Sequence, residues 1–195
     1  MNGVCTDISG VILAGGKGTR MGFPKSFLTV KGIKVIDTVL NILKSSFEEV
    51  FMVTDDKERF NEFKNVKVVE DLIRGCGPLG GIYAGLKGIC NDAAFFVACD
   101  MPFLHTDLIE RQISMFKELN CDCLVPRWEG AIEPLHAVYS KSSLPQVEIC
   151  LRTGELAVKE FLSHINCCYM DVDAKESGTF YNINTPQELK KIEDN

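Results

Sequence analysis

Short apolar runs alternate along the chain with longer stretches in which apolar residues recur every three or four positions. The short runs predict buried strands, and the three- and four-residue spacing predicts helices that pack against them. Strands are predicted over residues 10–14, 50–54, 67–70, 94–99 and 123–126. Helices are predicted around Val35–Leu43, Leu108–Phe116 and Gly154–His164. This alternation indicates an α/β fold, a three-layer α/β/α sandwich around a mostly parallel sheet.

Composition narrows the class of protein. A chain of 195 residues with 46% hydrophobic and 25% charged residues is typical of one globular domain. The formal net charge of −6 argues against a general nucleic-acid binder, which needs clustered cations. The sequence contains neither a secretory signal pattern nor an apolar run of the ~18 residues that would span a membrane. We therefore expect a cytoplasmic protein that binds neither nucleic acid nor membranes.

The nine cysteines are odd in number, and their spacing does not match that of zinc sites. We expect them to serve as small buried hydrophobic residues rather than as disulfides or metal ligands.

A glycine-rich loop, Leu13–Lys25, follows the first predicted strand and carries the cations Lys17, Arg20 and Lys25. Glycines let backbone N–H groups turn toward a ligand, so glycines beside cations indicate a polyphosphate site. Two common phosphate motifs are excluded. Met21 stands where the dinucleotide fingerprint needs its third glycine, and no Gly-Lys-Ser/Thr follows at the P-loop spacing.

An acidic residue, Asp100, directly follows the predicted strand 94–99, and Pro102 stiffens the chain after it. Loops at the carboxyl ends of parallel strands form the ligand crevice in open sheets, so Asp100 is expected to face the glycine-rich loop. Mg²⁺ commonly takes one or two carboxylates and completes its shell with phosphates and water. The position suits a magnesium ligand, and the alternative is a solvated or helix-capping aspartate.

A second glycine-rich segment follows the strand 67–70. Pro78 fits the first turn of a helix, which leaves Gly75–Gly77 as an entry where a base or ribose can approach the backbone. Asp71 could accept hydrogen bonds from ribose hydroxyls or base N–H groups. For Gly81 and Gly85 we favour close packing of this helix against the sheet.

Near the end of the chain, Asn182 and Asn184 are two residues apart on a stretch predicted to be extended, so their amides point the same way. They offer donors and acceptors to a polar substrate. Thr185 is predicted to cap a helix that begins at Pro186. No nucleophile has a base at a motif spacing. A phosphate monoester acceptor, largely ionised near neutral pH, would need no strong base, and catalysis would then reduce to positioning and charge stabilisation.

These motifs together resemble the molybdenum cofactor guanylyltransferase family. The resemblance spans residues 8 to about 190 and rests on Leu13-Ala14-Gly15-Gly16, Arg20-Met21-Gly22, Lys25, Gly77-Pro78-Leu79-x-Gly81, Cys99-Asp100-x-Pro102, Pro134-Leu135 and Asn182-Ile183-Asn184-Thr185-Pro186. It implies a Rossmann-like sheet of the nucleotidyltransferase type. It also implies transfer of GMP from GTP to molybdopterin, with release of pyrophosphate and formation of a guanine dinucleotide cofactor.

The resemblance also implies roles for individual residues. Nucleotide binding would fall to Leu13, Ala14, Gly15, Gly16, Lys25, Asp71 and Gly77. The catalytic residues would be Arg20, Lys25 and Asp100, and Asp100 would hold Mg²⁺. Molybdopterin would be bound by Asn182 and Asn184. On this reading the single domain has a nucleotide-binding part, about 8–105, and an acceptor-binding part, about 106–190.

Three other functions stay open on the sequence alone. A cytidylyltransferase acting on molybdopterin and a nucleotidyltransferase for a sugar phosphate share the first glycine-rich motif. A GTP-binding module without catalysis would keep the fold and lose the reaction. Transient contacts with proteins that deliver molybdopterin or receive the product are also expected.

Overall fold

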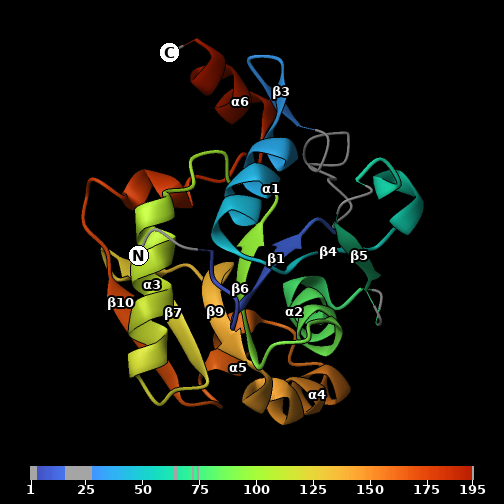
Figure 1. Ribbon diagram of the computed structural model, residues 1–195, viewed down its shortest axis with the longest axis vertical. Helices are drawn as coiled ribbons and strands as arrows, with labels where there is room; N and C mark the ends of the chain where they lie inside the picture. Colours follow the sequence, from blue (N-terminus) through green and yellow to red (C-terminus); the bar gives the residue numbers. More distant parts are fainter. Residues whose placement is uncertain (1–3, 16–27, 64–65, 72, 74, 195) are drawn as a thin grey trace.

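A mixed eight-stranded sheet forms the centre of the protein, in a computed structural model that describes residues 4–15, 28–63, 66–71, 73 and 75–194. Its strand order is β10-β7-β9-β6-β1-β4-β5, and β8 pairs with β7 (Figure 1). The strands are β1 Ser9–Leu13, β4 Val50–Thr54, β5 Lys67–Glu70, β6 Ala93–Ala98, β7 Cys123–Trp128, β8 Ala131–Ile132, β9 His136–Ser140 and β10 Cys167–Asp171. A separate hairpin joins β2 (Thr29–Val30) to β3 (Ile33–Lys34).

The sheet is mostly parallel. β1 pairs in parallel with both β4 and β6, β4 with β5, and β7 with β10. β9 runs antiparallel to both β6 and β7, and β8 is antiparallel to β7. The carboxyl ends of β1, β4, β5, β6, β7 and β10 therefore lie at one edge, as the predicted fold class requires.

Helices cover both faces of the sheet (Figure 1). One face carries α1 (Val35–Ser46) and α3 (Thr106–Glu118), and the other carries α2 (Gly77–Gly88), α4 (Leu144–Thr153) and α5 (Val158–Leu162). The last helix, α6 (Pro186–Glu193), lies beside the β2–β3 hairpin. Short 3₁₀ helices are η2 (Lys57–Phe60), η3 (Lys141–Ser143) and η4 (Ser177–Phe180).

Strand β1 shows how one sequence pattern supplies both layers of the core. Its side chains alternate between the two faces of the sheet. Ile12 packs into the cluster under α1 and α3, whereas Val11 and Leu13 pack into the cluster under α2. Every residue of β1 is buried, so the strand is covered on both faces of the sheet, which explains its nearly continuous apolar sequence.

The helix predicted around Gly154–His164 is confirmed over Val158–Leu162, where α5 lies, and α4 ends just before the predicted stretch. α4 ends at Thr153 because Gly154 adopts φ +82°, a left-handed conformation that glycine accepts readily. α5 then begins anew at Val158. The helix predicted to begin near Pro78 is confirmed as α2, with the proline in its first turn.

The expectation for the cysteines is only partly correct. All nine are free thiols, and Cys99, Cys123 and Cys150 are buried as expected. Cys90, in contrast, is exposed in the loop between α2 and β6, where its backbone amide binds a Glu49 oxygen at 3.1 Å. The remaining cysteines are partly exposed. Within the described ranges, no helix combines the length and apolar character needed to cross a membrane.

Candidate active site

The candidate site lies at the carboxyl edge of the parallel strands. Backbone hydrogen bonds continue past the strand ends there. The Cys99 amide donates to the Leu13 carbonyl at 3.1 Å, and the Asp71 amide donates to the Thr54 carbonyl at 2.7 Å. Because these bonds hold the first residues after the strands, the polar side chains at this edge have a fixed backbone.

Asp100 lies two residues after the last residue of the buried strand β6, and only 6% of its surface is exposed. Its carbonyl oxygen accepts a hydrogen bond from the Ile183 amide at 3.1 Å. This bond brings the segment Asn182–Asn184 to the end of β6. Two motifs far apart in the sequence are therefore adjacent in the fold.

No group of three or more metal-binding side chains gathers among the residues that the structure describes. A cation held by Asp100 would thus draw further ligands from substrate phosphates and water, which is the usual arrangement for Mg²⁺. The Asp100 carboxylate is the kind of hard oxygen ligand that Mg²⁺ prefers, whereas zinc prefers thiolate and imidazole ligands.

Asp71 follows β5 and lies against the first turns of α2. A methyl group on Gly80 would come within 3.2 Å of Asp71 Oδ1, so the glycine leaves room for the carboxylate. Burial raises the pKa of the Asp71 carboxyl, a hydrogen bond from the Ile73 amide at 3.1 Å lowers it, and the negative charge of Asp55 raises it further. A desolvated acid in a crevice is a candidate ligand-binding group.

Glycines shape the start of α2. Gly75 and Gly77 adopt φ +88° and +59°, so both use the left-handed conformation that other residues rarely adopt. A methyl group on Gly81 would lie 3.0 Å from Leu13 Cδ2, and one on Gly85 would lie 2.5 Å from Phe96 Cε1. The prediction that Gly81 and Gly85 serve close packing is confirmed.

The segment after Asn182 is held by the start of α6. Thr185 and Glu188 form the predicted cap as a complete capping box, in which the Thr185 hydroxyl accepts from the Glu188 amide. A Glu188 carboxylate oxygen also accepts from the Asn184 amide at 2.7 Å. The Asn182 side chain donates to the Phe180 carbonyl at 3.1 Å. Both asparagines are partly exposed, on a backbone fixed by this cap.

One acidic residue at this edge was not singled out from the sequence. Glu133 precedes β9, and the nearby Leu135 carbonyl accepts from the Ala98 amide at 3.1 Å, which ties the segment to the end of β6. Burial raises the pKa of the Glu133 carboxyl, while the positive charge of Lys159 opposes the rise.

Three of the residues predicted to bind phosphate, Gly16, Arg20 and Lys25, lie outside the described residues. The beginning of their loop is described: Ala14 is buried, and Gly15 is exposed beside the Asp55 backbone.

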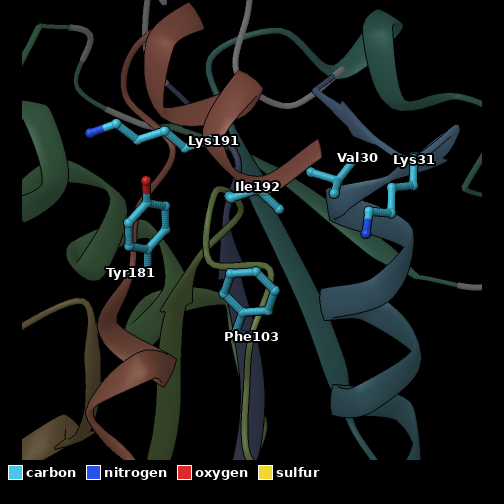
Figure 2. Close-up of a pocket in the computed structure, with 6 residues that line it drawn as sticks. All are labelled: Val30, Lys31, Phe103, Tyr181, Lys191 and Ile192. Carbon is cyan, nitrogen blue, oxygen red and sulfur yellow. The ribbon is translucent and has the colours of Figure 1, made fainter. Parts of the chain in front are cut away.

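A pocket of about 490 Å³ opens beside the end of β6 (Figure 2). Its walls come from the hairpin, the segment after Asp100, the segment before Asn182 and α6. The lining residues are Val30, Lys31, Phe103, Tyr181, Lys191 and Ile192. The Phe103 and Tyr181 rings have centroids 6.2 Å apart, and Phe103 is 43% exposed. No sequence motif predicted this pocket.

The strand order and the helices on both faces define a Rossmann-like α/β fold of the type found in solved nucleotidyltransferases. CMP-2-keto-3-deoxy-manno-octonic acid synthetase, solved with CTP, superposes with a TM-score of 0.75 over 96% of this chain and 97% of that chain. At 15% identity, this likeness concerns the fold alone.

The family assignment is more specific. The chain belongs to the family described as MobA-like NTP transferase domain, which matches residues 10–166. A probable molybdenum cofactor guanylyltransferase of Pelotomaculum thermopropionicum is 37% identical over 94% of this chain and 90% of its own length. One of Peptoclostridium acidaminophilum is 34% identical over 94% and 87%. Molybdopterin-guanine dinucleotide biosynthesis protein A of Archaeoglobus fulgidus superposes with a TM-score of 0.86 at 29% identity, over 96% of this chain and 97% of that chain. The resemblance stated from the motifs is thus confirmed.

Proposed function

We propose that this protein transfers GMP from GTP to molybdopterin, releasing pyrophosphate and forming the guanine dinucleotide cofactor. Family membership supports the reaction class, and relatives named molybdenum cofactor guanylyltransferase support the substrates. The observation that carries the proposal is the bond between Ile183 and Asp100, at 3.1 Å. This bond places the segment that would bind the acceptor, Asn182–Asn184, next to Asp100, which would act on the phosphates of the nucleotide.

The nucleotide would bind on the α2 side of this edge. Exposed Gly15 and Gly77 let a triphosphate and a nucleoside approach the backbone closely. Leu13, Ala14 and Gly16 would add further contacts to the nucleotide. The Asp71 carboxylate would accept hydrogen bonds from the ribose or the base. Arg20 and Lys25 would supply the positive charge that stabilises the triphosphate and the departing pyrophosphate.

The acceptor would bind beside Asn182 and Asn184, whose amides offer both donors and acceptors. An oxygen of its phosphate monoester attacks the α-phosphorus of GTP, and the bond between the α-phosphorus and the bridging oxygen of pyrophosphate breaks. The attacking oxygen is already ionised near neutral pH, so the protein need not remove a proton from it. Positioning and charge stabilisation therefore account for catalysis.

Asp100 is the residue that would hold Mg²⁺, which when bound neutralises charge on the phosphates. We also propose that the reaction takes place in the cytoplasm, with transient contacts to the proteins that deliver molybdopterin and receive the product. The net charge of −6 favours small-molecule substrates over nucleic acid as partners.

The test is release of pyrophosphate by purified protein with Mg²⁺ and molybdopterin, comparing GTP, CTP, ATP and UTP. Release with GTP alone is the expected result. A preference for CTP would move the protein to the cytidylyltransferases. Absence of release with all four nucleotides, while GTP still binds, would favour a GTP-binding module without catalysis.

A pair of variants tests the role of Asp100. Asp100→Asn keeps the size of the side chain and removes its charge, so metal-dependent release should fall at least a hundredfold. Asp173→Asn changes an exposed acid in the loop after β10 and should leave release unchanged. Near-normal activity of Asp100→Asn, with circular dichroism showing a folded protein, would contradict the metal role.

A further inference from the structure

The pocket beside the end of β6 combines two features that suit a flat polar ring. The first is an aromatic wall made by Phe103 and Tyr181, whose ring planes are inclined by 56°. The second is a pair of lysines on opposite sides, Lys31 from the hairpin and Lys191 from α6 (Figure 2). Its volume of about 490 Å³ lies within the range of small-molecule sites, roughly 300–1,000 Å³.

The backbone of Lys31 supports a role for this side chain. Lys31 adopts φ +49°, and the next residue, Gly32, adopts φ +81°. Two residues with positive φ are typical of the tight turn of a hairpin, in which asparagine or glycine is the usual first residue. A lysine here carries a conformational cost. The turn places its side chain on the pocket side of the hairpin (Figure 2).

The pocket is close to the reacting centre along the chain. Phe103 is three residues after Asp100, a separation of at most about 11 Å. Tyr181 is two residues before Ile183, whose amide binds the Asp100 carbonyl at 3.1 Å. A fused-ring heterocycle with a phosphate on a short side chain has the length to place its ring in the pocket while its phosphate reaches the end of β6.

We infer that the pocket lined by Phe103, Tyr181 and Lys31 binds the ring of the acceptor substrate. This inference rests on the proposed function and assigns the acceptor's heterocycle to residues that the motifs do not include. The ring stacks on Phe103, and its carbonyl and ring-nitrogen acceptors receive hydrogen bonds from Lys31 and the Tyr181 hydroxyl. The two lysines also attract the anionic phosphate ester. The nucleotide lies on the other side of Asp100, toward α2.

Steady-state kinetics at saturating GTP, with molybdopterin varied, tests the pocket. Stacking on an aromatic ring stabilises a bound heterocycle, so Phe103→Ala should raise the KM for molybdopterin about tenfold. Lys31→Met should raise it as well, and the effect should shrink at high salt. The KM for GTP should stay within twofold in both variants.

Matched controls use residues of the same type outside the pocket. Tyr169→Ala removes an aromatic side chain that is 40% exposed on β10, and Lys175→Met removes an exposed lysine in the loop after β10. Neither should change the KM for molybdopterin. Thermal unfolding of each variant establishes that it is folded.

The results distinguish failure of the pocket assignment from failure of the proposed function. If the wild-type protein transfers GMP but Phe103→Ala and Lys31→Met keep the wild-type KM for molybdopterin, the pocket assignment is wrong and the proposed function stands. If the wild-type protein transfers no nucleotide to molybdopterin, both fail. A change of sedimentation coefficient in Phe103→Ala, without a change of KM, would instead identify this face as an interface between two copies of the chain.

Discussion

The Ile183 amide donates a hydrogen bond to the Asp100 carbonyl at 3.1 Å, and the Ile183 side chain is fully buried in the core beneath α1 and α3. A core residue thus fixes the backbone of the two asparagines proposed to bind the acceptor. The stability of the core and the geometry of the acceptor site are therefore linked through a single residue.

Shortening Ile183 should loosen this link. Ile183→Ala leaves a cavity in a packed core and should lower the free energy of unfolding by about 2–5 kcal/mol, whereas Ile183→Val should cost only about 1 kcal/mol. Urea denaturation measures both values. Below its unfolding transition, the alanine variant should show a higher KM for molybdopterin and an unchanged KM for GTP. Equal stability losses for the two variants would mean that the surrounding residues collapse to fill the cavity.

Nucleotide binding should depend on the ionisation of Asp71. The carboxylate accepts hydrogen bonds only when ionised, and burial together with the charge of Asp55 raises its pKa. Affinity for GTP should therefore be full above that raised pKa and fall as the pH drops through it. Asp55→Asn removes the neighbouring charge, lowers the pKa of Asp71 and should move this loss of affinity to lower pH.

Binding of a fluorescent GTP analogue across pH 4–8 measures the shift. Glu58→Gln, an exposed acid in η2, serves as the control and should leave the profile in place. A profile that does not respond to Asp55→Asn would show that another group controls the affinity.

Much of the part of the sheet that is proposed to bind the nucleotide could be predicted from the sequence because its signals are local. The strands at 50–54 and 67–70 are correct to the residue. Charged residues stand at or next to both ends of each strand. β1 and β6 each begin and end one residue earlier than predicted. The position of Asp100 follows from the buried run before it, and that of Pro78 from the preference of proline for a first helical turn.

The part of the chain that is proposed to bind the acceptor could not be predicted in the same way. β9 begins at His136 within a stretch of mixed polar and apolar residues, and its place in the sheet depends on long-range pairing with β6. Without β9, nothing in the sequence brings Glu133 to the carboxyl edge. The pocket depends on contacts between the hairpin, α6 and Phe103, which no local pattern reports.

Close packing of α2 on the sheet predicts that Gly85→Ala is destabilising although alanine favours helices. A methyl group at Gly85 would lie 2.5 Å from Phe96 Cε1 and 3.1 Å from Val11 Cγ1. Overpacking of this kind costs about 1–3 kcal/mol, against a gain in helix propensity of at most about 1 kcal/mol. A lower melting temperature is expected. Gly178→Ala has no atom within 4 Å of the added methyl and should leave it nearly unchanged.

The burial of His136 predicts that the protein loses stability in acid. Its ring is fully buried between Phe95 and Phe180, at centroid distances of 4.9 and 5.4 Å, and neither nitrogen has a hydrogen-bond partner among the described residues. Burial lowers the pKa of His136 from 6.5 to about 4. As the pH falls, the unfolded chain therefore binds a proton before the folded protein does.

The contribution of His136 to stability is complete above pH 6.5 and is lost between pH 6.5 and about 4. A difference of that size corresponds to roughly 3 kcal/mol, because each pKa unit is worth about 1.4 kcal/mol. His136→Leu replaces the imidazole with an apolar side chain of similar size and so removes the titrating group. The stability of this variant should therefore fall less than that of the wild-type protein as the pH is lowered. Urea midpoints of both proteins at pH 7 and pH 4.5 measure the difference. Because all other titrating groups are the same in the two proteins, the comparison isolates the effect of His136. Parallel losses in the two proteins would show that His136 is protonated, or accessible to water, in the folded state.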